Sequence, residues 1–162
     1  MPSVTLVQFA AAAVVSYLGL LAGFVLASLT KEELPTAKKY FPLLQRLIIL
    51  AVAAVAMEYF SFSIFVKTAA YLLLLLFLAV SIRTSFYYAV FGVVAFFVSA
   101  SQNALLVLSS LVFLFGLLSG SIYFERNVKK KADFASKAAE MLVGNSFYPA
   151  VAVVLYAASV YV

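Results

Sequence analysis

Long runs of apolar residues dominate the chain, and short polar or charged stretches separate them. A helix needs about 20 apolar residues to cross the hydrocarbon layer of a bilayer, and most of the runs approach or exceed this length. The runs predict six membrane-spanning helices, arranged as three hairpins, over 4–29, 42–60, 64–82, 86–100, 104–124 and 147–162. The expected fold class is therefore all-α, a polytopic transmembrane helical bundle in which residues 1–162 form a single integral membrane domain.

The fourth and sixth predicted spans are short. The sixth has 16 residues, against a usual minimum of about 17, so we expect it to have little tilt or to lie where the bilayer is thin. Between the fifth and sixth spans, apolar residues recur at helical spacing and predict a cytoplasmic amphipathic helix over 127–143. We expect this helix either to continue the fifth span into water or to lie along the membrane surface.

Composition supports membrane insertion. Hydrophobic residues make up 67% of the chain and charged residues 10%, whereas a soluble domain has about half and a quarter respectively. A water-soluble fold of this length has too little interior to bury so much apolar surface.

The net charge of +5 is concentrated on one predicted side of the membrane. In a six-span topology the first, third and fifth loops, with the adjoining helix ends, carry Lys31, Lys38, Lys39, Arg46, Arg83, Arg126, Lys129, Lys130, Lys131 and Lys137. The opposite side carries Lys67 alone. The positive-inside rule then predicts a multi-pass protein of the cell membrane with both termini outside.

Two similar strings, Gly19-Leu-Leu-Ala-Gly23 and Gly116-Leu-Leu-Ser-Gly120, place glycines four residues apart in the first and fifth spans. Gly19, Gly23, Gly116 and Gly120 are candidate packing residues, because glycine lets two helix backbones approach closely. The strings indicate either an internal repeat around a central pathway or the ordinary usage of small residues in membrane helices. We expect the partners to be other helices of a homo-oligomer or of a second membrane protein, together with membrane lipids.

Glu58 is the acidic residue that the pattern places deepest in the bilayer. Fifteen steps from Leu43 put it roughly 22 Å across a hydrocarbon layer of about 30 Å. Two interpretations follow. Glu58 either pairs with Lys67 across a tight turn, or lines an outward-facing polar vestibule with the other polar residues predicted on that side, Gln8, Lys67, Gln102 and Asn103.

The chain contains no Cys, no His and one aspartate, Asp133. These absences exclude disulfides, cysteine nucleophiles and histidine chemistry, and no other pattern predicts a catalytic, cofactor or metal site. An enzyme is accordingly the third hypothesis, and we expect no cofactor.

A basic cluster follows the fifth span and comprises Arg126, Lys129, Lys130, Lys131 and Lys137. It fits binding of anionic lipid head groups, docking of a cytoplasmic partner, or an orientation signal alone. Because the positive charges lie next to predicted spans, we do not expect a nucleic-acid partner.

The sequence favours a non-catalytic subunit or scaffold of a membrane complex that packs through its small-residue helix faces. The alternative is a small transporter or channel for an ion or small solute, with Glu58 near the vestibule. A transporter is expected to have broken helices or several polar groups near the middle of the bilayer. In the sequence, only Ser109 and Ser110 are predicted at that depth.

Overall fold

The computed structural model describes residues 4–30, 32, 34–37, 39–59, 63–79, 84–127 and 134–160. This part contains eight helices and no strand, which confirms the all-α prediction at that level. The helices are α1 (Leu6–Leu29), α2 (Leu34–Ala37), α3 (Phe41–Tyr59), α4 (Ile64–Ala79), α5 (Thr84–Val98), α6 (Gln102–Asn127), α7 (Phe134–Gly144) and α8 (Phe147–Val160). The predicted span ends at 60, 80–82 and 161–162, and the basic residues Lys31, Lys38, Arg83 and Lys129–Lys131, lie outside the described residues.

Four helical stretches are long and apolar enough to cross a membrane: Leu6–Leu29, Phe41–Tyr59, Gln102–Asn127 and Phe134–Ala158. The last stretch combines α7 with most of α8. Helices α4 and α5 are also apolar but shorter. These lengths and compositions are those of a membrane protein. The helical form fits as well, because a bilayer-spanning helix satisfies its backbone hydrogen bonds within itself.

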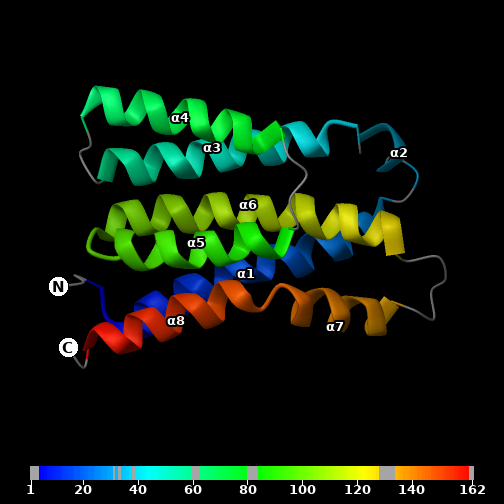
Figure 1. The fold of residues 1–162 in the computed structure, drawn as a ribbon. Coiled ribbons are helices and arrows are strands. Elements are labelled where there is room, and N and C mark those ends of the chain that lie inside the picture. The colour runs from blue at the N-terminus through cyan, green and yellow to red at the C-terminus, as the bar shows by residue number, and fades with distance from the viewer. Residues whose placement is uncertain are drawn as a thin grey trace.

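The main helices lie side by side along one direction, and α7 and α8 follow each other end to end (Figure 1). The start of α1 and the end of α8 lie at the same end of the bundle, where the rings of Phe9 and Tyr156 stack with centroids 4.6 Å apart. Helices α1, α5, α6 and α8 surround the main buried cluster, α3 packs on α6, and α4 is attached mainly to α3.

Helix α7 differs from the expected amphipathic helix in its surroundings. Its apolar face packs against α1 and α6, where Met141 is buried and the ring of Phe134 lies 4.9 Å from that of Phe24. Lys137 and Glu140 lie on the more exposed side and form an ion pair of 2.6 Å. The apolar face therefore packs on the protein's own helices instead of the membrane surface. Together α7 and α8 form one apolar stretch that is longer than α8 alone.

Helices α1 and α6 share the most extensive contact in the described structure. Their backbones touch at the four glycines, which are all buried. A Cβ atom added at Gly23 would lie within 3.0 Å of the Leu117 carbonyl oxygen, and one added at Gly120 within 3.0 Å of the Leu20 carbonyl oxygen.

The contacts also give the relative direction of the two helices. Gly19 faces Phe113 and Gly23 faces Leu117, so α1 and α6 advance together and run parallel. The Ser121 hydroxyl donates a 3.0 Å hydrogen bond to the Gly23 carbonyl and links the two backbones. Because both glycine faces are covered within one chain, they are not available to a helix of another protein.

We expect alanine, the smallest possible side chain, to be too large at the crossing. Gly23→Ala and Gly120→Ala should each lower the free energy of unfolding by about 1–3 kcal/mol, because the helices must separate to admit one methyl group. Unfolding of the purified protein in detergent micelles measures the change. Gly144→Ala is the matched control and should be nearly neutral, since a Cβ at Gly144 meets nothing within 4 Å. Equal stability of all three variants would contradict the close crossing.

Candidate functional site

Two helices begin inside the bundle at a common depth. Helix α8 starts at Phe147, after the turn at Asn145 and Ser146 that separates it from α7, and α5 starts at Thr84 beside this turn. The 15 residues of α5 extend roughly 22 Å, whereas the 26 residues of α6 extend roughly 39 Å. Among the described residues, α5 therefore accompanies α6 over only part of its length.

The break between α7 and α8 is stabilised by hydrogen bonds from four directions. The Asn145 amide side chain donates to the Met141 carbonyl at 2.8 Å, and the Ser146 backbone N–H donates to Val143 at 3.3 Å. The Ser85 hydroxyl donates to the Gly144 carbonyl at 2.9 Å, and the Tyr17 hydroxyl donates to the Leu142 carbonyl. Helix-end carbonyls at membrane depth need such partners, and here α1 and α5 supply two of them.

A small cleft of about 130 Å³ lies next to the break. Residues from α1, α5, α6 and α7, with Asn145 of the turn, line it: Leu20, Thr84, Ser119, Ile122, Tyr123, Arg126, Asn127, Met141 and Asn145. Ser119 is buried and accepts a 2.8 Å hydrogen bond from the Gln45 side chain of α3. The Tyr123 hydroxyl is buried and lies beside the Glu140 carboxylate of α7.

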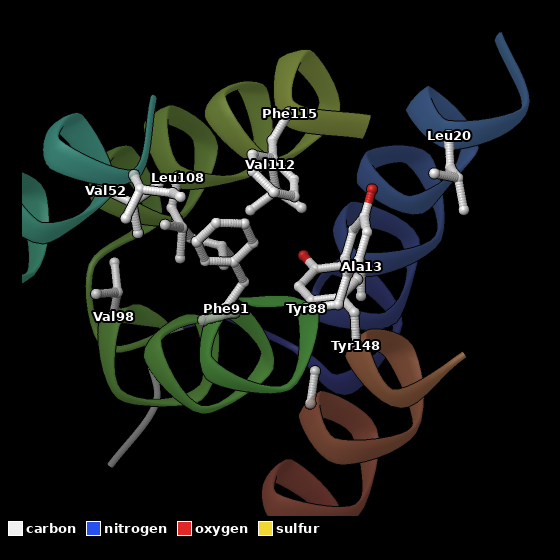
Figure 2. Close-up of a cluster of buried hydrophobic side chains, with 14 of the residues drawn as sticks. Ala13, Leu20, Val52, Tyr88, Phe91, Val98, Leu108, Val112, Phe115 and Tyr148 are labelled. Atoms are coloured by element: carbon white, nitrogen blue, oxygen red, sulfur yellow. The ribbon is translucent and has the colours of Figure 1, made fainter. Parts of the chain in front are cut away.

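Four aromatic residues form a buried layer in the interior of the bundle. Tyr88, Phe91, Phe115 and Tyr148 come together between α5, α6 and α8, with the ring of Tyr88 5.6 Å from that of Phe115 and 6.2 Å from that of Tyr148 (Figure 2). Tyr88 is fully buried, and its hydroxyl lies beside the Ser119 hydroxyl, which also accepts the hydrogen bond from Gln45. A buried hydroxyl needs such a polar neighbour, because leaving it without one is costly.

The sequence placed Glu58 and Lys67 in one vestibule with three other residues. In the structure they lie at the far end of the α3–α4 hairpin, where the Lys67 Nζ atom is 2.7 Å from a Glu58 carboxylate oxygen. The Glu58 side chain is 83% exposed and the Lys67 side chain 23% exposed. The two residues form an ion pair well away from the cleft.

Gln8 and Gln102 lie in a different place, a larger and mostly apolar groove of about 720 Å³ between α1 and α6. Gln8 also completes a capping box with Thr5 at the start of α1. Asn103 is exposed and does not line the groove. Among the described residues, those expected in the vestibule therefore lie in two places, the Glu58–Lys67 pair and the α1–α6 groove.

Of the two described members of the basic cluster, Arg126 lines the cleft and Lys137 does not. Lys137 is paired with Glu140, and Lys129, Lys130 and Lys131 lie outside the described residues. Sequence reasoning missed Thr84, Ser119, Tyr123 and Asn145 as a group. The available signal was the shortness of the fourth and sixth predicted spans, which marks two helices that begin within the bundle.

No protein-family model, no curated protein and no solved structure matches the chain. Within the described ranges, no three acidic side chains gather in a way that would hold a metal ion. The interpretation of the site therefore depends on its geometry.

The unequal exposure of the ion pair leads to a prediction. Glu58→Gln leaves the half-buried Lys67 ammonium without its partner, whereas Lys67→Met leaves only an exposed carboxylate. We expect Glu58→Gln to lower the melting temperature more than Lys67→Met, and the double variant to match Lys67→Met. Thermal unfolding in detergent measures the order, with Glu32→Gln as the control for loss of an exposed carboxylate. Equal losses in the two single variants would show that exposure does not govern the pair.

Proposed function

We propose that the protein crosses the membrane six times, with α7 and α8 together forming the sixth traverse. The 11 and 14 residues of these helices, joined by a two-residue turn, are long enough for this role. Among the described basic residues, Lys39, Arg46, Arg126 and Lys137 lie toward one end of the bundle and Lys67 toward the other. By the positive-inside rule the first end faces the cytoplasm, and both termini of this cell-membrane protein lie outside.

Within this topology we propose that the protein binds a small polar solute in the cleft and acts as a small transporter or channel. The observation that carries the proposal is the break between α7 and α8 beside the start of α5. Transporters form their binding sites from such interrupted helices, because the helix ends supply polar groups at a depth where continuous helices supply none. An interrupted helix is a feature expected of a transporter, and the sequence alone did not predict one.

The residues of the cleft have separate roles in this proposal. Ser119 and Tyr123 contact the solute through hydroxyl groups, Thr84 lines the cleft, and Asn145 holds the helix break in position. The layer formed by Tyr88, Phe91, Phe115 and Tyr148 separates the cleft from the outer half of the bundle. This arrangement corresponds to a state open only toward the cytoplasm, and Glu58 has no part in binding.

A non-catalytic subunit of a membrane complex remains the second candidate, and one observation favours it. Helix α4 contacts little besides α3, and Phe65 and Leu73 on it are 84% and 67% exposed. A partner helix would cover this surface better than lipid only if it packs closely there. Native mass spectrometry of the gently extracted protein distinguishes the candidates, because a subunit retains a second protein and a transporter of this kind does not need one.

Cysteine substitution tests the transport proposal directly, since the chain has no cysteine of its own. Vesicles containing the Thr84→Cys protein should take up one or more small polar solutes, as followed by osmotic swelling. Modification of that cysteine with a bulky water-soluble thiol reagent should reduce uptake at least about tenfold, because it fills a cleft that holds only about four water volumes.

The unmodified sequence provides the control, because the reagent has no thiol to attack there. Val93→Cys gives a second control: Val93 is exposed on the outer side of α5, where lipid should keep the thiol unreactive. Uptake that continues after complete modification at position 84, or a Thr84→Cys thiol that no water-soluble reagent reaches, would overturn the proposed function.

A further inference from the structure

From the groups that line the cleft, we infer that its ligand is a small oxyanion, a carboxylate or phosphate group held by Arg126. The inference rests on the proposed function, in that it names the solute class for the same cleft. Three independent properties of the cleft support it: its charge, its balance of donors and acceptors, and its size.

The described lining of the cleft carries one formal charge, and it is positive. Arg126 is the one charged residue among the nine described residues that line it, and none of them is acidic. Within the described structure Lys67 and Lys137 are paired with carboxylates, whereas Arg126 forms no ion pair. Its planar guanidinium has five N–H donors arranged to bind two oxygens of a carboxylate or phosphate at once. The helix dipoles act in both directions, because Thr84 places the positive end of α5 at the cleft, whereas Asn127 and Asn145 place the negative ends of α6 and α7 there.

The hydrogen-bonding groups favour a ligand that accepts. The carbonyls exposed by the helix break, which a cation would need, already accept hydrogen bonds from the chain: Met141, Leu142, Val143 and Gly144. The other polar groups near the cleft are hydroxyls, which can donate a hydrogen bond to a ligand. Tyr123 lines the cleft with its hydroxyl beside the Glu140 carboxylate, and Tyr88 lies one turn after Thr84, leaning toward the start of α5 as helical side chains do. Ser119, which lines the cleft, lies beside the Tyr88 hydroxyl.

The volume limits the ligand to a small group. A cleft of about 130 Å³ equals about four times the volume that one water molecule occupies in the liquid. This accommodates one carboxylate or phosphate group, either free or as part of a lipid whose tails lie outside the cleft. A nucleotide or a sugar is too large.

The test compares the rates at which an anionic sulfonatoethyl and a cationic trimethylammonioethyl methanethiosulfonate modify the Thr84→Cys protein. The protein is held in nanodiscs of net-neutral lipid. Each rate is divided by the rate at which the same reagent reacts with free 2-mercaptoethanol, which corrects for the reactivity of the reagent itself. We expect the anionic reagent to react faster, and Arg126→Gln to lower the ratio of the two rates by about tenfold through loss of one nearby charge. Arg126→Lys should retain most of the preference. Arg46→Gln is the matched control for an exposed arginine outside the cleft and should leave the ratio unchanged.

Inorganic phosphate and anionic lipid then identify the source of the anion. Free phosphate should slow modification in the parent but not in Arg126→Gln, at an ionic strength matched with chloride. Protection by anionic lipid alone supports the same oxyanion site and assigns it to a lipid head group. Equal rates for the two reagents, unaffected by Arg126→Gln, would contradict the binding of an oxyanion but would be consistent with a water-filled cleft and the proposed function. A thiol that neither reagent modifies would contradict the proposed function itself.

Discussion

The contact between the backbones of α1 and α6 is the interaction on which the rest of the structure depends. Hydrophobic burial does not hold membrane helices together, because lipid is as apolar as a leucine side chain, so association depends on close packing and interhelical hydrogen bonds. Gly23 and Gly120 provide the close packing, and the Ser121 hydroxyl adds a hydrogen bond between the helices. With these two helices fixed, α8 packs on α1, α3 packs on α6, and α5 closes the ring between α6 and α8.

A second constraint explains why the cleft lies where it does. An interrupted helix exposes carbonyl groups that hydrocarbon cannot satisfy, so a break is tolerated only where protein or water supplies donors. Tyr17 from α1 and Ser85 from α5 do so at the end of α7. The break and the short α5 therefore depend on each other, and the polar cleft forms where both occur.

The hydrophobic runs predicted the membrane class and the helical fold because length and composition alone decide whether a segment can cross a bilayer. They did not predict the position of α7, since an amphipathic pattern is the same whether the apolar face meets a membrane surface or the side of Phe24. The cleft could not be predicted from the sequence either. Thr84, Ser119, Tyr123 and Asn145 are each unexceptional in sequence. They come from three distant stretches of the chain, and only the packing of the helices brings these stretches together. Glu58 attracted attention because a charge in an apolar run is conspicuous, yet it lies near the end of α3, paired and exposed.

The parallel crossing has a consequence for the order of events during synthesis. Gly19 is made about 100 residues before Gly116, which at roughly 5–20 residues per second leaves α1 in the membrane for about 5–20 s before its partner exists. Throughout that interval the flat glycine face of α1 is in contact with lipid or with whatever protein assists insertion. The nascent chain thus exposes a helix-packing face that α6 covers in the folded protein. A chain truncated before α6 keeps this face exposed.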